Sequence, residues 1–447
     1  RLPLAGHLRR AAALARDGVP VAPGLARAIE ARAPQIAADP GLSALLTPGG
    51  RALTSDDTLV QPALAATLET IATDGPGSFY GGAVGAALVG GMQAAGSAMT
   101  LADLALHRAE QAAPLSAELL GATWHVAPPP SAGITLLAML DGLDGDRLPL
   151  QRARDAAAAR DRFLGDPRRG PLDLAALRAA DPAGSPRAAA ASDTTPAGPP
   201  RADASGATPA AADLLPAGNE RAAGDTVAIA AIDSEGRAVT VVQSVYQTFG
   251  AGLLEPSTGI VLHNRGSAFS LQPGHPAEIG GGLRPPHTLC PALVIADGTI
   301  TAAGCQGGRA QPQVLAQLAA DLADPSADLP AAVARPRWVV GTRDMDREVE
   351  TVLAEPEAAA PAADAAPAAD AAVPAPADAA GRFDGLAAEA AEAGVAFERL
   401  PAPTGLAGHV QAARLAADGA QQAATDPRAD GVATTFAPAP DDEDRPS

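Results

Sequence analysis

The sequence predicts an α+β fold, with a helical first half and a β-rich second half. Apolar residues recur at helical spacing in the first half, whereas apolar and small residues alternate in the second half with the period of a strand. Between them, residues 184–225 are rich in Ala, Pro, Gly, Asp and Ser and follow neither period. We therefore expect a first portion over residues 1–183, a linker over 184–225 and a second portion over 226–447, with a low-complexity insertion near 354–381.

The helices of the first portion are predicted from apolar spacing and from residues that favour helix ends. Leu25, Ile29 and Ile36 are spaced to share one helical face. A second helix is expected to begin at Pro62, which suits a first helical turn, and to end before Gly75. The remaining elements expected here are a helix over Gly82–Ala95 and a strand, proline loop and helix over Trp124–Leu140.

The second portion is predicted to contain two β-hairpins and a helix. Alternating valines and isoleucines flank the turn Asp233–Gly236, and a second alternating pair of runs spans Cys290–Gly304. Asp297-Gly298 lies at the centre of the second pair, and Asp-Gly strongly favours a two-residue hairpin turn. The segment Gln311–Leu322 is predicted to be one helix with a proline in its first turn.

Composition and charge exclude several classes of function. The net charge is −19 at pH 7 and all basic charge is arginine, so a nucleic-acid partner is not expected. No apolar run is long enough to span a membrane, and no signal peptide is visible, which leaves cytoplasmic and periplasmic or secreted locations open. The cysteines Cys290 and Cys305 have no metal-ligand spacing, so we expect two buried thiols, no metal and no cofactor.

A threonine stands where the predicted linker changes into a predicted strand. The linker ends in Gly224-Asp225, and the strand pattern begins at Thr226. Enzymes that cut their own chain before a threonine need this arrangement, because the freed α-amine then serves as the base for the threonine hydroxyl. An α-amine has a pKa of about 8, which suits work near neutral pH. By itself a threonine at a strand start is ordinary, so the interpretation of Thr226 as a nucleophile depends on the neighbouring motifs.

Ordered motifs surround this threonine on both sides. Downstream they are GDTVAIAAIDSEGRAVTVVQS (224–244), FGAGLLEPSTGIVLHNRGSAFS (249–270), GGLRPPHTLCPALVIADG (281–298), GCQGGRAQP (304–312), RPRW (335–338) and DPRADG (426–431). Upstream they are DGPGSFYGG (74–82), GSAMTLADL (96–104) and PPPSAG (128–133). Together they resemble the small and large subunits of γ-glutamyltransferases, a family of N-terminal-nucleophile hydrolases. The resemblance covers nearly the whole chain apart from the two low-complexity tracts.

The resemblance implies a fold, a maturation step and a set of site residues. The fold is a four-layer αββα sandwich, and self-cleavage between Asp225 and Thr226 gives a large and a small subunit that stay associated. Carried over by position, Thr226 is the nucleophile and Ser244 is a hydroxyl residue that orients it. Gly307 and Gly308 match the pair whose backbone N–H groups form the oxyanion hole, a task that suits glycine because the backbone must approach closely.

The substrate-binding positions depart from the pattern of strict γ-glutamyl enzymes. Ala268 occupies the place of the acid that binds the substrate's α-amine, and Arg265 replaces a neighbouring amide residue. His287-Thr288 replaces a serine pair that binds the carboxylate, and Tyr246 replaces an asparagine. Ala268 cannot bind an ammonium group, whereas Thr288 retains a hydroxyl that can donate a hydrogen bond. The pattern resembles the acylase-like branch of the family.

The family's large subunits begin with a further segment that has no counterpart here. That segment carries a glycine-rich strand and an arginine that clamps the substrate carboxylate, and nothing matching it precedes Arg1. Loss of core strands would expose wide apolar faces and unpaired strand edges. We therefore expect the sequence to be a fragment.

Three functions remain open from the sequence. The leading expectation is an amidohydrolase or acyltransferase for γ-glutamyl compounds such as glutathione. The second is an acylase for other amides, such as glutaryl-type or acyl-β-lactam side chains. The third, from another class, is an inactive member that stays uncut. In the first two cases the partner is a small-molecule amide, and the two subunits come from one precursor.

Overall fold

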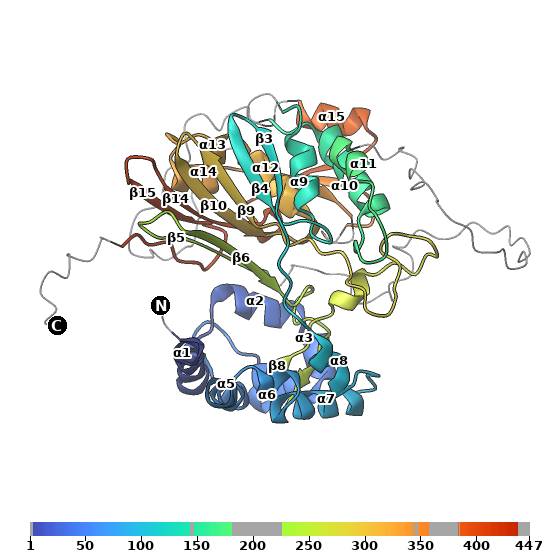
Figure 1. The fold of residues 1–447 in the computed structure, drawn as a ribbon, viewed down its shortest axis with the longest axis vertical. Helices are drawn as coiled ribbons and strands as arrows, with labels where there is room; N and C mark the ends of the chain where they lie inside the picture. The colour runs from blue at the N-terminus through green and yellow to red at the C-terminus, as the bar shows by residue number, and fades with distance from the viewer. Residues whose placement is uncertain are drawn as a thin grey trace, which may run out of the picture. The chain divides into compact units, whose positions relative to one another are not determined.

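The computed structural model describes residues 3–143, 147–180, 226–342, 345, 347–356, 383 and 385–436, and Figure 1 shows their elements. The predicted linker over 184–225, Asp225 included, lies outside the described residues. So does the predicted insertion from residue 357 onward to 381, whereas strand β12 (Thr351–Ala354) and Glu355 precede that gap. The chain divides into two compact units, Arg1–Ala112 with Ser244–Asn264 and Ala113–Gln243 with Arg265–Ser447.

The first unit is mainly helical. Its helices are α1 (Leu4–Asp17), α2 (Pro23–Ala31), α3 (Ala33–Ala38), α4 (Pro40–Leu46), α5 (Pro62–Asp74), α6 (Gly77–Tyr80), α7 (Ala83–Ala94) and α8 (Leu101–Leu106). Its short strands are β1 (Val19–Pro20), β2 (Thr58–Leu59), β7 (Leu254–Glu255) and β8 (Ile260–Val261). The predicted helix from Pro62 to Gly75 and the one over Gly82–Ala95 are confirmed as α5 and α7.

The helical face through Ile29 and Ile36 is divided between two helices. Both isoleucines are fully buried, as their spacing predicts. The chain leaves helical geometry at Arg32, where φ is −110° and ψ is 17°. A continuous helix would need the N–H that Pro34 lacks, whereas a proline in the first turn of a new helix is well tolerated. The spacing therefore predicts the burial of Ile29 and Ile36 correctly, but the single helix expected to carry both is two helices.

A six-stranded antiparallel sheet is the centre of the second unit. Its order is β15-β14-β10-β9-β4-β3. The strands are β3 (Leu115–Leu119), β4 (Ala122–Val126), β9 (Ala292–Ala296), β10 (Thr299–Gln306), β14 (His409–Leu415) and β15 (Gln421–Thr425). The predicted strand, loop and helix over Trp124–Leu140 are confirmed as β4 and α9 (Gly133–Leu140).

Helices cover one face of this sheet and a second sheet covers the other (Figure 1). Ala303 and Cys305 of β10 join the core that the helices complete, and Gly304 points the opposite way. The helices against the sheet are α9, α12 (Gln311–Gln317), α13 (Ala319–Ala323) and α14 (Leu329–Ala334), and α10 (Leu150–Phe163) and α11 (Leu174–Ala179) pack against α9. The second sheet is the predicted first hairpin, β5 (Thr226–Ile232) and β6 (Ala238–Ser244). This α+β layering confirms the predicted fold class.

A three-stranded sheet completes the second unit. It consists of β11 (Trp338–Gly341), β12 and β13 (Ala396–Arg399), with α15 (Leu386–Glu392) beside it. In the described part of the chain, no helix has both the length and the apolar character needed to cross a membrane.

The second predicted hairpin is confirmed, and the helix after it is not continuous. Thr299 pairs with Ala296, so Asp297-Gly298 forms a two-residue loop, and both loop residues have positive φ, 47° and 74°. The predicted helix over Gln311–Leu322 is interrupted at Leu318, whose N–H bonds to the carbonyl three residues earlier instead of four. Helices α12 and α13 therefore replace one longer helix.

Candidate active site

Thr226 lies at the end of the six-stranded sheet where β10 finishes. Ala228 of β5 packs over Gly304, where the Ala228 Cβ would lie 3.3 Å from an added glycine Cβ. The hairpin turn at Gly236 lies instead over Ile300, near the start of β10. Side chains alternate along a strand, so Thr226 shares the inner face with Ala228. Being two residues farther from the turn, Thr226 lies toward the carboxyl end of β10.

The predicted oxyanion-hole glycines follow β10 at that same end. Gly307 has φ of 151° and Gly308 has φ of 51°, both in the region that favours glycine. The turn η4 (Gly308–Ala310) then leads into α12, and Ala310 N–H donates to the Gly307 carbonyl at 2.9 Å. The two glycines thus form a tight turn between a strand and a helix, without side chains to block approach to their N–H groups. We call Gly307-Gly308 the oxyanion turn.

The predicted carboxylate-binding pair also approaches this end of the sheet. The β9–β10 ladder ends with Ala292 opposite Ala303, so the residues before Ala292 continue toward the oxyanion turn. Gln311, which follows the turn, accepts a hydrogen bond from Cys290 N–H at 3.1 Å. Thr288, two residues earlier, is 9% exposed. Thr226, the oxyanion turn and Thr288 therefore come from three segments that meet at one sheet end.

The PPPSAG loop fixes the backbone around His287. His287 N–H donates to the Pro130 carbonyl at 2.9 Å, and Ala132 N–H donates to the His287 carbonyl at 3.0 Å. Ser131 adds a hydrogen bond from its hydroxyl to the Leu289 carbonyl at 2.5 Å. This loop belongs to the portion that precedes the expected cleavage site. Both portions of the chain therefore build the candidate site.

Burial and two arginines control the charge of His287. Burial, then the neighbouring Arg265 and Arg284, lower the pKa of His287 to about 4, so the imidazole is neutral at neutral pH. Its Nδ1 is buried and has no hydrogen-bond partner among the residues the structure describes. Arg284 is paired with the buried Asp166, to which its Nη2 donates at 3.1 Å. Although burial opposes ionisation, hydrogen bonds from Arg284 help to hold the pKa of Asp166 below its ordinary value.

Arg265 brings a positive charge to the region where the strict γ-glutamyl pattern has an acid. Arg265 and Ala268 are the first and last residues of the short turn η3 (Arg265–Ala268). The positive charge of Arg265 contributes to the lowered pKa of His287. Arg284, the other arginine that acts on His287, is paired with Asp166, whose carboxylate offsets its charge.

Ser244 and Tyr246 belong to the first unit. Ser244 is the last residue of β6, and its hydroxyl oxygen accepts a hydrogen bond from Tyr246 N–H at 2.8 Å. Tyr246 has φ of 82°, a backbone conformation that non-glycine residues rarely adopt. Their predicted roles in orienting the nucleophile and binding substrate stay predictions. The cleavage-site residue Asp225 lies outside the described residues.

Sequence reasoning missed the groups that hold the site segments in place. Asp166 pairs with Arg284 across 118 positions of sequence, and no local pattern indicates such a partner. The motifs RPRW and DPRADG were recognised without a role, although they contribute Arg337, Asp426 and Arg428 to a buried cluster. Within the described ranges, no group of three or more His, Cys, Asp or Glu side chains could hold a metal ion.

Comparison with known proteins finds a matching family profile and two similar proenzymes. The Gamma-glutamyltranspeptidase family profile matches residues 1–436. The oxamate amidohydrolase proenzyme of Klebsiella pneumoniae is 36% identical over 76% of this chain and 63% of its own length. The glutathione hydrolase-like YwrD proenzyme of Bacillus subtilis is 31% identical over 76% of this chain and 64% of its own length.

A solved structure shows the same fold. Cephalosporin acylase from Bacillus halodurans superposes with a TM-score of 0.73 at 23% identity, covering 98% of this chain and 75% of the acylase chain. The chain spans less than two thirds of the length of the two curated relatives named above. Since the family profile extends over almost the entire sequence, this chain belongs to the γ-glutamyltranspeptidase family.

Proposed function

We propose that this protein is an amide hydrolase that matures by cutting its own chain between Asp225 and Thr226. The observation that carries the proposal is the meeting of Thr226, the oxyanion turn and Thr288 at one end of the six-stranded sheet. The names of the relatives from Klebsiella pneumoniae and Bacillus subtilis, both proenzymes, support the maturation step.

The proposed chemistry uses Thr226 twice. After cleavage, the α-amine of Thr226 takes the proton of its own hydroxyl, and Oγ attacks the carbonyl carbon of the substrate amide. The N–H groups of Gly307 and Gly308 stabilise the oxyanion that develops. The protonated amine then gives its proton to the leaving nitrogen, the C–N bond breaks, and an acyl ester on Thr226 remains. Water, activated by the same amine, hydrolyses the ester and releases the acid.

We further propose that the acyl group carries a carboxylate and no α-ammonium. The positive charge of Arg265 favours a carboxylate, whereas that of Arg284 is already paired with Asp166. The methyl group of Ala268 offers an ammonium no partner. An ammonium placed beside Arg265 would also meet like-charge repulsion. Oxamate, the compound in the name of one relative, has a carboxylate beside its amide and no ammonium. Glutaryl amides likewise carry a carboxylate and no ammonium, although a propylene chain separates their carboxylate from the amide.

A γ-glutamyl substrate is the second candidate. The Bacillus subtilis relative with glutathione hydrolase in its name favours this alternative. Thr288 provides a hydroxyl that can donate to a carboxylate in either case. The two candidates differ only in the α-amine of the acyl group, so a paired comparison separates them.

The test compares γ-glutamyl and glutaryl anilides on the matured enzyme. We expect kcat/KM for the glutaryl anilide to equal that for the γ-glutamyl anilide or to exceed it by up to about tenfold, or roughly 1.4 kcal/mol, because no buried acid loses a partner when the amine is absent and Arg265 repels the amine. Arg265→Glu should shift the preference toward the γ-glutamyl anilide by at least about tenfold. A preference of a thousandfold or more for the γ-glutamyl anilide in the wild type would overturn the proposed acyl group.

Arg237→Glu is the matched control for this charge reversal. Arg237 lies at the β5–β6 turn, where it pairs with Asp233 at 2.7 Å, at the opposite end of β5 from Thr226. Its replacement changes the net charge by the same amount as Arg265→Glu. It should leave the ratio of the two kcat/KM values unchanged.

A further inference from the structure

A fully buried cluster of two arginines and two carboxylates joins the ends of three strands. Arg337 precedes β11, Glu355 follows β12, and Asp426 and Arg428 follow β15. Each of these side chains is at most 2% exposed. The two positive and two negative charges balance, and burial of this many charges is tolerated only when their polar atoms are paired.

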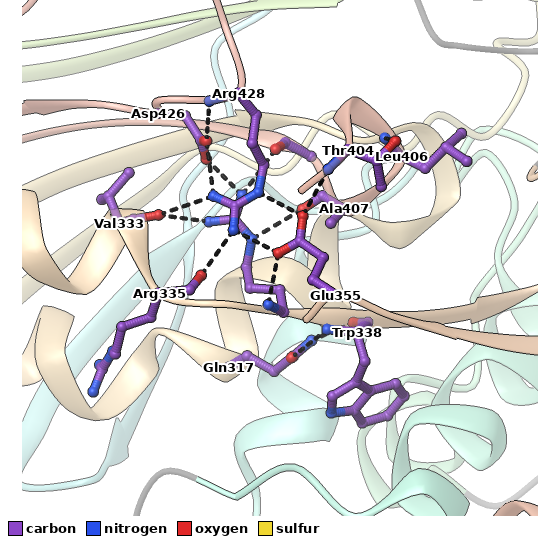
Figure 2. Close-up of polar contacts among 12 residues, drawn as sticks. Gln317, Val333, Arg335, Trp338, Glu355, Thr404, Leu406, Ala407, Asp426 and Arg428 are labelled. Carbon is purple, nitrogen blue, oxygen red and sulfur yellow. Dashed lines mark hydrogen bonds and ion pairs between the residues drawn. The ribbon is translucent and has the colours of Figure 1, made fainter. Parts of the chain in front are cut away.

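Arg428 ties the two carboxylates together, as Figure 2 shows. Its Nε donates to Glu355 Oε1 at 2.7 Å, and its Nη1 donates to Asp426 Oδ1 at 3.0 Å. Although burial opposes ionisation, the charges of Arg337 and Arg428 hold the pKa of Asp426 below its ordinary value. The Asp426 carboxylate is therefore fixed and charged at neutral pH.

The cluster holds the segment 404–410 at four backbone atoms. Glu355 Oε1 accepts from Thr404 N–H at 2.9 Å, and Asp426 Oδ2 accepts from Val410 N–H at 3.0 Å. Arg337 donates to two successive carbonyls, through Nε to Ala407 at 3.0 Å and through Nη2 to Gly408 at 2.9 Å. Both ends and the middle of this segment are thus bonded to buried charges.

The held segment lies directly against the oxyanion turn. The last pair of the β10–β14 ladder is Gln306 with His409, so Gly307 and Gly408 face each other one residue beyond it. A Cβ on Gly307 would lie 3.5 Å from the Gly408 Cα, and a Cβ on Gly408 would lie 2.6 Å from the Gln306 carbonyl oxygen. The two backbones are in close contact, so a displacement of Gly408 is transmitted to Gly307.

We propose that Arg337, held by Asp426 and Glu355, is a positioning residue for the oxyanion turn. It fixes the carbonyls of Ala407 and Gly408, and Gly408 in turn fixes Gly307 in the conformation that aims its N–H at the reacting oxygen. The inference rests on the proposed amide hydrolysis. A purely structural role would change stability alone, whereas a positioning role changes stabilisation of the oxyanion relative to substrate binding.

The test is Arg337→Lys, with Arg414→Lys as a control of the same chemistry. Arg414 is 2% exposed and also donates to buried carbonyls, among them Ala327 at 2.7 Å. It pairs with Thr301, at the far end of the β10–β14 ladder from Gly307. Lysine keeps the charge in both variants but cannot bond several carbonyls through one planar group. Both variants therefore lose hydrogen bonds to buried carbonyls, and they differ in the distance of the substituted residue from the oxyanion turn.

The measurements are kcat and KM for whichever anilide the wild type hydrolyses, and the Kd of 3-carboxypropylboronic acid. That boronic acid forms a tetrahedral adduct on the threonine hydroxyl and places an oxygen in the oxyanion hole. Active-site titration restricts both measurements to matured enzyme. Arg337→Lys should lower kcat at least about tenfold with KM within about threefold, and should weaken boronate binding by a similar factor. Arg414→Lys should lower the melting temperature and leave kcat and the boronate Kd within about twofold.

Equal loss of kcat in both variants, or an unchanged boronate Kd in Arg337→Lys, would overturn the positioning role. If Arg337→Lys does not fold, Gly408→Ala takes its place, because it changes no charge and inserts a Cβ against the Gln306 carbonyl. An unchanged kcat in that variant would contradict the inference equally. If the wild-type protein shows no Thr226-dependent turnover, the proposed function fails and this inference fails with it. If the wild type turns over substrate and only the expected effects of the variants are missing, the inference alone fails, so the two failures can be distinguished.

Discussion

At the residue scale, His287 shows how burial and neighbouring arginines keep an imidazole neutral. The chain carries a net charge of −19, yet burial and two nearby arginines lower the pKa of His287 to about 4. A neutral imidazole carries no positive charge, and it can accept one hydrogen bond and donate another. Its buried Nδ1 has no hydrogen-bond partner in the described part of the chain.

This pKa predicts a specific dependence of stability on pH. An unfolded histidine has a pKa of about 6.5, so between pH 6.5 and 4 the unfolded chain binds a proton that the folded protein excludes. The contribution of His287 to the free energy of unfolding is therefore fully present above pH 6.5 and is lost as the pH falls toward 4. His287→Gln should remove this part of the slope, worth up to about 3 kcal/mol, in urea unfolding measured across that range.

A second histidine serves as the control for that measurement. His125 lies on β4, where its Nδ1 hydrogen bonds with the Ser116 hydroxyl at 2.7 Å. The slope that His125→Gln gives between pH 6.5 and 4 is the baseline for a histidine-to-glutamine exchange. If His287→Gln changed the slope no more than this baseline, His287 would not be held neutral in the folded protein.

At the element scale, the contact between β5–β6 and β10 determines where Thr226 lies. Gly304 is the residue of β10 over which the hairpin packs, since an added Cβ would lie 2.9 Å from Thr240 Cγ2 and 3.0 Å from Val242 Cγ2. The absence of a side chain there allows the two sheets to approach. A larger residue would separate them at the point closest to Thr226 and the oxyanion turn.

Gly304→Val should therefore destabilise the second unit and slow turnover. Overpacking of this kind costs about 1–3 kcal/mol, and displacement of the nucleophile adds a loss of kcat. The check is thermal unfolding together with kcat of matured enzyme. Gly281→Val is the matched control, because an added Cβ at Gly281 meets nothing within 4 Å. Equal effects of the two substitutions would show that the hairpin contact is not tight.

Elements that obey local rules were predictable from the sequence, and elements that depend on distant partners were not. The Asp297-Gly298 turn and the start of α5 at Pro62 follow from residues within the element itself. The break at Leu318 has no proline or glycine to indicate it. The Arg337–Asp426 pair joins residues 89 positions apart, so its partners emerge only from the folded sheet.

At the scale of the whole molecule, the candidate site draws on both portions of the chain. The loop Pro128–Gly133 precedes the expected cleavage position and holds His287, whereas Thr226, the proposed nucleophile, and the oxyanion turn follow that position. Maturation at Thr226 would therefore leave a site built from two polypeptides that stay associated. The expectation that two polypeptides build the site comes from the family resemblance. No single motif in the sequence indicates which distant segments meet.

The most direct test of the central claim is mass spectrometry of the purified protein and of its Thr226 variants. We predict a small subunit that begins at Thr226 in the wild type, and amide turnover that accompanies it. Thr226→Ala should stay uncut and lose several orders of magnitude in kcat, while Thr226→Ser keeps the hydroxyl and retains part of both activities. A wild-type chain that stays uncut after long incubation, or Thr226→Ala turnover at the wild-type rate, would contradict the account.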